Sequence, residues 1–178
     1  MIANLIAFAW GFAEATLFFI VPDVALSVIA LEGVDIGLVA CLYALAGALV
    51  GGTIMYYWGR ADIEKVTRVL RMLPAIPSKD IEKVRSDLQR SGISAMLLGP
   101  LSGIPYKIYA AHAHLTTSIF YFILISIPAR IIRFILIAFV TPYIMDTFLP
   151  NAAYSLRVQV VLIFWIFSYS IYFMLKRK

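Results

Sequence analysis

Residues 36–58 have the sequence IGLVACLYALAGALVGGTIMYYW, a run of 23 residues without a charge. A helix needs about 20 mostly apolar residues to cross the roughly 30 Å hydrocarbon core of a bilayer, so this run predicts a membrane-spanning helix. Small residues recur along it at spacings of three and four, and these are Gly37, Ala40, Ala44, Ala48 and Gly51. Because a stripe of small side chains lets a second helix approach closely, we expect this stripe to be a packing face.

The composition of the whole chain agrees with a membrane location. Of its 178 residues 62% are hydrophobic and 14% are charged, and the mean hydropathy is +0.91. Soluble domains average about 45 to 50% apolar and about 25% charged residues, so a soluble globular domain is excluded. We expect a single all-α polytopic membrane domain that occupies residues 1–178.

Residues 59–93 are the markedly polar part of the chain and carry eight of its 15 basic residues. Apolar residues recur there at helical spacing on both sides of Pro74 and Pro77, which predicts two amphipathic helices. We expect Ser78 to cap the second helix and Gly92 to end it. An excess of Lys and Arg marks cytoplasmic loops, so this helical hairpin is placed on the cytoplasmic side.

Short apolar segments broken by Pro and Gly flank these regions. Residues 24–31 are too short to cross a bilayer, and they follow an apolar run that ends at Pro22. Residues 94–115 contain two short arms around Gly99, Pro100, Gly103 and Pro105, which one continuous helix would not tolerate. A turn inside the membrane survives where protein or a water-filled cavity shields its backbone, so roughly residues 7–31 and residues 94–115 predict re-entrant hairpins. For residues 1–22 the sequence allows either a hairpin arm or a full span.

The remaining apolar runs complete the predicted topology. Residues 116–140 span the membrane, residues 141–155 form a loop with Pro142 and Pro150, and residues 158–175 form a last span. The domain then divides into a first hairpin and span (1–58), the cytoplasmic hairpin (59–93), a second hairpin and span (94–140) and the final helix. Hairpin plus span occurs twice in opposite orientation, which is the inverted-repeat plan of many secondary transporters.

Glu14, Lys107, Arg130 and Arg133 fall at membrane depth in this topology. Each costs about 2.5 to 3.5 kcal/mol at the centre of a spanning helix, so they need partners or water. The cations outnumber the anions even when Asp23 is added, and phosphate suits two arginines and a lysine. We therefore expect an anion site at Arg130, Arg133 and Lys107, with Glu14 exchanging protons. The alternative is a structural brace in which Arg130 pairs with Glu14 or Asp23, while Lys107 and Arg133 extend to water.

Other chemistries find little support in the sequence. His112 and His114 point about 200 degrees apart on a helix and do not share a metal easily. Ser102 lies in a segment close to the serine motif of intramembrane proteases, but the spacing is one residue too long. Cys41 is the single cysteine, which excludes an intrachain disulfide. We expect no enzyme, no metal and no cofactor.

Several short motifs resemble the DedA family, also called VTT or SNARE-associated membrane proteins. They are Glu14 ahead of Pro22 and Asp23, the segment 47–60 that ends Tyr-Trp-Gly-Arg, the segment 99–107 with Gly-Ile-Pro-Tyr-Lys, and the segment 129–134 with Arg-x-x-Arg-Phe. The likeness covers roughly residues 10–140. Asp23 stands where the family usually has Glu, and Lys107 stands where many members have Arg.

The resemblance implies two opposed re-entrant hairpins and a role in moving lipids across bilayers. It places the acidic residues of the family at Glu14 and Asp23, which would carry proton coupling, and its essential arginines at Arg130 and Arg133. The expected function is flipping or scrambling of a phosphate-bearing lipid, such as undecaprenyl phosphate or a phospholipid.

Two alternatives are a transporter of small soluble anions or proton antiporter, and a non-transporting membrane assembly factor. The expected partners are protons and membrane lipids with an anionic or phosphate head group. We expect no nucleic-acid partner, and the sequence allows a homo-oligomer. The expected location is a prokaryotic inner (cytoplasmic) membrane, with the C-terminus cytoplasmic.

Overall fold

The chain is helical and carries three long apolar helices. The computed structural model describes residues 1–74, 76–99 and 103–176, which contain no strand and give a helix content of 84%. Helices α3 (Val34–Ala61), α8 (Ile119–Phe148) and α9 (Tyr154–Lys176) are long and apolar enough to cross a membrane. The predicted all-α class and the predicted transmembrane helices are confirmed at this level.

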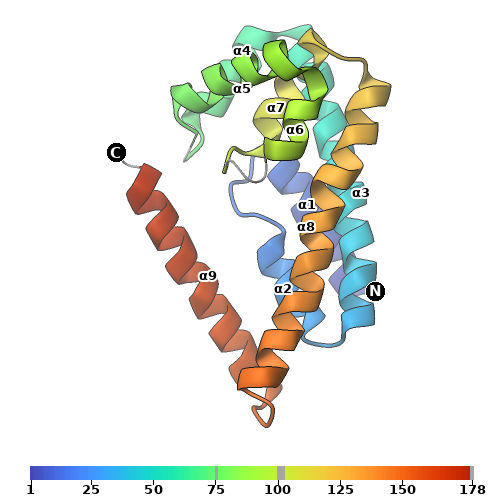
Figure 1. Cartoon of the computed structure of the whole chain (residues 1–178), viewed down its shortest axis with the longest axis vertical. Coiled ribbons are helices and arrows are strands. Elements are labelled where there is room, and N and C mark those ends of the chain that lie inside the picture. The colour runs from blue at the N-terminus through green and yellow to red at the C-terminus, as the bar shows by residue number, and fades with distance from the viewer. Residues whose placement is uncertain (75, 100–102, 177–178) are drawn as a thin grey trace.

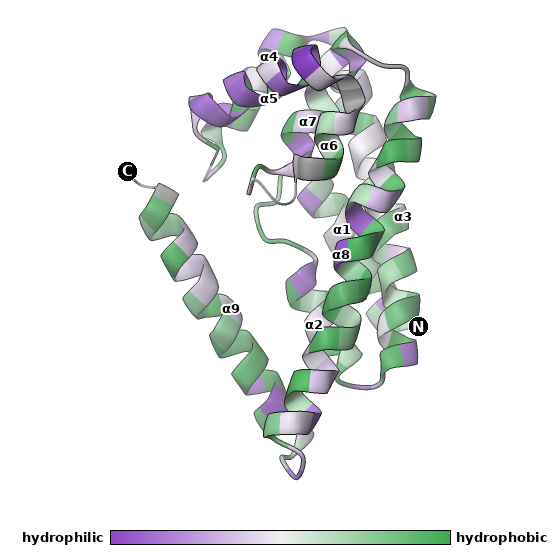
Figure 2. Cartoon of the chain, viewed as in Figure 1, coloured by the Kyte–Doolittle hydropathy of each residue, from purple (hydrophilic) through white to green (hydrophobic). Residues whose placement is uncertain are grey.

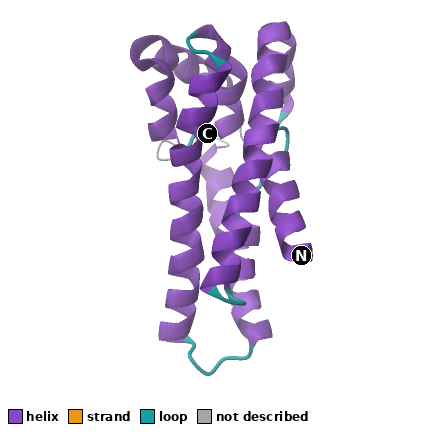
Figure 3. Ribbon diagram, turned by 90° about the vertical axis from the view of Figure 1, so that its right-hand side faces the viewer, coloured by secondary structure: helices purple, strands orange, loops and turns teal. Residues whose placement is uncertain are grey.

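Polar and apolar parts of the chain are separated in space. The amphipathic helices α4 (Ile63–Met72) and α5 (Ser78–Ser91) cover one end of the molecule, and Figure 2 shows this cap as its most hydrophilic part. Helices α3 and α8 extend away from the cap, and α9 returns from the far end at an angle to α8 (Figure 1). Figure 3, turned by 90°, shows that helices make up most of the described chain and that short loops connect them.

Helices α1 (Ile2–Ala15) and α2 (Asp23–Ala30) form an antiparallel pair. Helix α1 packs on α3 so closely that a Cβ added at Gly47 would overlap the carbonyl oxygen of Phe8, and one at Gly51 would lie 2.7 Å from that of Phe12. A Cβ at Gly37 would lie 2.9 Å from the Cβ of Ala30 in α2. The predicted small-residue packing face of α3 is therefore confirmed.

The segment after the cap forms a second, shorter pair. It consists of α6 (Ala95–Leu98) and α7 (Tyr106–His112), and α7 is followed by the 3-10 turn η3 (Ala113–Leu115). Gly103 has φ +67°, a left-handed conformation that favours glycine, and Pro105 immediately precedes α7. The predicted turn residues Gly99 and Gly103 thus lie after the end of α6 and before the start of α7. Pro100 and Ser102 lie outside the described residues.

The two pairs open towards opposite ends of the molecule. Helix α1 runs towards the cap and α2 runs away from it, whereas α7 runs from its turn back to the cap (Figure 1). The start of α7 therefore lies near the connection between α1 and α2. The ammonium group of Lys107, at the start of α7, donates a hydrogen bond to the carbonyl oxygen of Phe18 between α1 and α2.

Two sequence-based boundaries are wrong. Helix α8 does not end at residue 140 but continues through Pro142 to Phe148, so the predicted loop 141–155 shrinks to residues 149–153. Proline removes one helical hydrogen bond, but within an apolar helix that packs on its neighbours the helix can pass through it, as it also does at Pro128. Helix α9 accordingly begins at Tyr154, ahead of the predicted start at residue 158.

The predicted amphipathic helices are present, with one different cap. Pro77 precedes α5, and Ser78 is its first helical residue and makes no side-chain cap hydrogen bond. Gly92 ends α5 with φ +58°, as expected. The other amphipathic helix, α4, does have a side-chain cap: Asp62 accepts a hydrogen bond from the backbone N–H of Lys65 at 2.8 Å.

His112 is buried where the cap meets α7, outside the three long helices. Its Nδ1 lies 2.8 Å from the carbonyl oxygen of Ile108, and its Nε2 lies 3.4 Å from the hydroxyl of Thr67 in α4. Desolvation by burial lowers the pKa of His112 to about 4, against about 6.5 in an unfolded chain. The folded protein therefore keeps the imidazole neutral at a pH where the unfolded chain binds a proton.

This burial predicts a loss of stability in mild acid. The stabilising contribution is complete above about pH 6.5 and decreases as the pH falls from there to about 4. Thermal unfolding in detergent at pH 8 and pH 5 should show a larger decrease in Tm for the native chain than for His112→Gln. An equal decrease for both proteins would contradict the assignment to His112.

Candidate functional site

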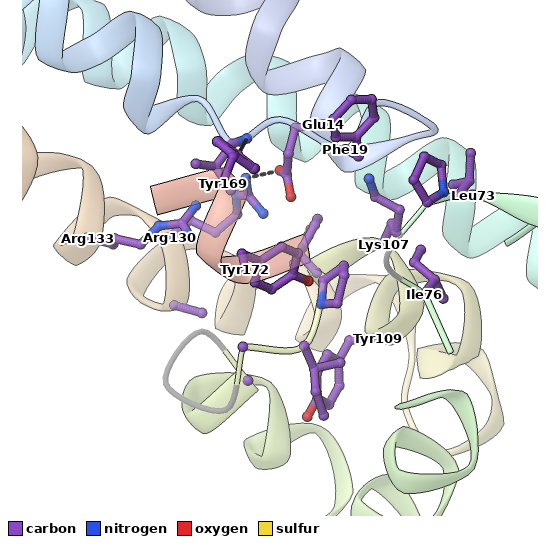
Figure 4. A pocket seen from close by; sticks show the side chains of 18 of the residues that line it. Glu14, Phe19, Leu73, Ile76, Lys107, Tyr109, Arg130, Arg133, Tyr169 and Tyr172 are labelled. Atoms are coloured by element: carbon purple, nitrogen blue, oxygen red, sulfur yellow. Dashed lines mark hydrogen bonds and ion pairs between the residues drawn. The ribbon is translucent and has the colours of Figure 1, made fainter. Parts of the chain in front are cut away.

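A cavity of about 320 Å³ lies where the two turns, α8, α9 and the α4–α5 connection meet (Figure 4). Its charged lining side chains among the described residues are Glu14, Lys107, Arg130 and Arg133. They come from α1, α7 and α8, so segments distant in the sequence build one site. Apolar and aromatic side chains form the remaining walls, and they include Phe19, Leu73, Ile76, Met96, Trp165, Tyr169, Tyr172 and Phe173.

Arg130 forms the buried centre of the site. It is 3% exposed and pairs with the carboxylate of Glu14, which is 5% exposed. Its guanidinium carbon lies 4.3 Å from the ring centroid of Tyr106 and 5.3 Å from that of Phe134, so aromatic faces add cation–π stabilisation. Phe122, Ser126 and Phe134 are buried at four-residue intervals on the same stripe of α8, which explains why Arg130 points inward.

The Tyr106 ring, which lies against the Arg130 guanidinium, is itself held in place. Its hydroxyl donates to the hydroxyl of Ser126 at 3.0 Å, and Ser126 donates in turn to the carbonyl oxygen of Phe122 at 2.7 Å. A Cβ added at Gly52 would overlap the Tyr106 hydroxyl, so the glycine makes room for the ring. Helices α3 and α8 therefore both position Tyr106 under Arg130.

Arg133 and Asp23 form a second, more open ion pair. The distance from Arg133 Nε to Asp23 Oδ2 is 3.4 Å, and the Arg133 side chain is 31% exposed. Asp23 is buried at the first turn of α2, and its Oδ1 atom has no hydrogen-bond partner among the described residues. The buried Nε atom of Arg130 also lacks one in the same described part of the chain. The network therefore has spare hydrogen-bonding capacity.

Lys107 is 2% exposed, so it does not extend to water as the brace alternative predicted. Its described hydrogen bond goes to the Phe18 carbonyl oxygen and not to a carboxylate. Three cations thus face two carboxylates in this cluster, which leaves one positive charge in excess. A monoanion in the cavity would neutralise the cluster.

The structure brings together the five charged residues named from the sequence. Pro22 caps α2 directly before Asp23, and Gly99, Gly103 and Pro105 line the cavity, so these turn residues also belong to the site region. Pro100 lies outside the described residues. The predicted pairing of Arg130 with a carboxylate is present, and Glu14 is its partner.

Sequence reasoning missed the aromatic wall supplied by α9. Tyr169 accepts a hydrogen bond from the backbone N–H of Val21 at 2.7 Å, and Trp165 Nε1 donates to the hydroxyl of Ser27 at 2.9 Å. Trp165, Tyr169 and Tyr172 recur at spacings of four and three residues, a helical stripe that the sequence contains. This periodicity could have assigned one face of the last helix to the site.

A metal centre has no support in the described part of the chain. No group of three or more His, Cys, Asp or Glu side chains there could hold a metal ion. Cys41 is buried in α3.

Comparisons with protein-family models, characterised proteins and solved structures give no match to this chain. The function is therefore inferred from the geometry and charge of the cavity.

Proposed function

We propose that this protein moves a phosphate-bearing lipid across the bilayer, by flipping or scrambling. The observation that carries the proposal is the excess positive charge of Lys107, Arg130 and Arg133 at a cavity bordered by a long apolar helix. A charged cluster at membrane depth marks a substrate path more often than a purely structural feature. A phospholipid or a polyprenyl phosphate such as undecaprenyl phosphate supplies the missing anion.

In this proposal the helix pairs α1–α2 and α6–α7 are re-entrant hairpins that enter from opposite faces of the membrane. Together with α3 and α8 they constitute two inverted repeats. The support is that the pairs open to opposite ends and that their turns touch through Lys107 and Phe18. Alternating access would follow from changes at this contact, which lies beside the anion site.

The motifs shared with the DedA family favour the same function, and we propose that the chain is a divergent member. The basic cap then lies on the cytoplasmic side of a prokaryotic inner membrane, because basic residues mark that side. The C-terminus of α9 would then also be cytoplasmic, because two candidate spans follow the cap: α8 leaves it and α9 returns towards it.

Phosphate binding would rearrange the ion pairs. Guanidinium groups bind phosphate oxygens bidentately, so Arg130 can exchange the Glu14 carboxylate for the lipid phosphate. A carboxylate that loses its cation inside an apolar environment gains a proton more readily. Glu14 and, at the second pair, Asp23 would thereby couple head-group binding to proton uptake.

Replacement of Lys107 tests the anion site. Loss of a charge-assisted hydrogen bond costs about 1.5 to 3 kcal/mol, so Lys107→Met should slow transbilayer movement of a fluorescent phospholipid or polyprenyl phosphate in liposomes by about ten- to a hundredfold. Lys107→Arg, which keeps the charge, should retain most of the movement. Lys79→Met removes an exposed charge on α5 and serves as the matched control. Unchanged movement in folded Lys107→Met would reject its role.

A second candidate function is a non-transporting assembly factor. The observation that favours it is the buried pair of Arg130 and Glu14, which joins α8 to α1 as a brace would. A brace needs only that the two charges match, whereas an anion site needs the cations themselves. Variants that remove both charges therefore separate the two functions.

A further inference from the structure

The walls of the cavity differ sharply in chemistry. Helices α7 and α8 supply Lys107, Arg130 and Arg133, whereas α9 supplies aromatic rings and Ser168. The α4–α5 connection adds apolar side chains at Leu73 and Ile76. Figure 4 shows the two arginines at one side of the cavity and Leu73 and Ile76 at the other, with Tyr172 between them in this view.

Helix α9 has two distinct faces. Its inward stripe includes Trp165, Tyr169 and Tyr172, which line the cavity. Its opposite face is apolar and open, and Phe164 and Phe167 there are 60% and 64% exposed. The outer face suits the bilayer, while the aromatic stripe faces a site that also contains three cations. An aromatic surface beside an anion site suits an amphiphile better than a small soluble anion, which has no apolar part to bury.

The inward side of α9 contacts the first helix pair at several points. Trp165 and Tyr169 hydrogen-bond to Ser27 and to the backbone of Val21, and the rings of Phe173 and Phe19 lie 5.8 Å apart. These contacts hold α9 against the first helix pair. Phe173 also lines the cavity, as does Leu73 of the α4–α5 connection.

The volume limits what the cavity can enclose. About 320 Å³ equals roughly ten water-sized groups at about 30 Å³ each. A phosphate group and a short part of a hydrocarbon chain fill this space, so the rest of a lipid chain must leave it. Apolar lining for that part of the chain comes from Phe173 of α9 and from Leu73 and Ile76 of the α4–α5 connection.

We propose that the aromatic face of α9 is the binding site for the hydrocarbon chain of the anionic lipid. The phosphate lies at Lys107, Arg130 and Arg133, and the chain lies against Trp165, Tyr172 and Phe173 and exits beside Leu73. This inference rests on the proposed function and adds the part of the site that recognises the chain. It makes α9 the element that distinguishes a lipid phosphate from free phosphate.

The test uses the full chain in detergent micelles and a phosphatidic acid with a diazirine in one acyl chain. After photolysis, mass spectrometry should find label on Tyr172, Phe173 or Leu73, and excess unlabelled phosphatidic acid should reduce it. In the double variant Tyr172→Ala with Phe173→Ala, the label on the unchanged Leu73 should fall at least about fivefold, because apolar contact with the chain worth at least one or two methylene groups is lost. Phe173→Leu, which stays apolar, should retain it.

The matched control is Phe164→Ala with Phe167→Ala on the outer face of α9, which should leave the cavity label unchanged. Label confined to the outer face would overturn the proposal. Displacement by inorganic phosphate at the same concentration as by phosphatidic acid would also overturn it, because the chain would then add nothing to binding. Cavity label without lipid movement in liposomes would keep the chain site and reject translocation, and movement without cavity label would do the reverse.

Discussion

Arg130→Ala should lower the free energy of unfolding by about 3 to 5 kcal/mol, because it leaves the buried Glu14 carboxylate without its counter-ion. The pair joins α1 to α8, and both side chains are almost fully buried. Loss of the stacked guanidinium would also leave an empty volume beside Tyr106 and Phe134. Unfolding of the purified protein in detergent, followed by heat or denaturant, measures the change.

The double variant Arg130→Ala with Glu14→Ala provides the control. Removing both charges should restore a large part of the stability, since no buried charge then lacks a partner. If the loss of stability in the double variant equalled the sum of the losses in Arg130→Ala and Glu14→Ala, the ion pair would be contradicted. In liposomes the folded double variant should lose lipid movement if Arg130 binds phosphate, and should retain full function if the pair is only a brace. Recovery of activity by the swap Glu14→Arg with Arg130→Glu would likewise favour the brace.

Gly47→Leu should separate α1 from α3. A Cβ at this position would overlap the Phe8 carbonyl oxygen and lie 2.9 Å from the Phe12 nitrogen, and both obstacles are backbone atoms that cannot turn away. Overpacking costs about 1 to 3 kcal/mol and occasionally more, and we expect at least the upper value here. Because α1 carries Glu14, the displacement should also weaken the pair with Arg130 and slow lipid movement.

Ala46→Leu is the matched control for Gly47→Leu. Ala46 is the preceding residue of α3 and is exposed on the apolar surface. A leucine at this position contacts lipid or detergent. It should change the free energy of unfolding by no more than about 0.5 kcal/mol, as a typical surface substitution does. Equal effects of the two substitutions would contradict close packing of α1 on α3.

The long helices could be predicted because a spanning helix has a minimum length and composition. The small-residue face of α3 was also predictable, because it depends only on the spacing of small residues along a helix. The end of α8 was not, because Pro142 breaks a helix in many settings and is tolerated here within an apolar packed helix. The aromatic stripe of α9 was present in the sequence, but nothing local to it indicates which neighbours it faces.

The charged cluster was predictable as a set but not in its pairing. Arg130 and Arg133 lie three residues apart, which places them on neighbouring but not identical directions of α8. Arg130 consequently points into the core, while the Arg133 side chain is 31% exposed at the edge. The contact of Lys107 with Phe18 depends on the irregular backbone between α1 and α2, which periodicity does not describe.

The most direct test of lipid translocation compares two substrates in the same liposomes. Native protein is reconstituted, and transbilayer movement of a fluorescent phospholipid or polyprenyl phosphate is measured beside uptake of radioactive inorganic phosphate, with and without a proton gradient. The proposed function predicts movement of at least one lipid above that in protein-free vesicles, with no comparable phosphate uptake. Phosphate uptake without lipid movement, or neither activity from folded protein, would contradict it.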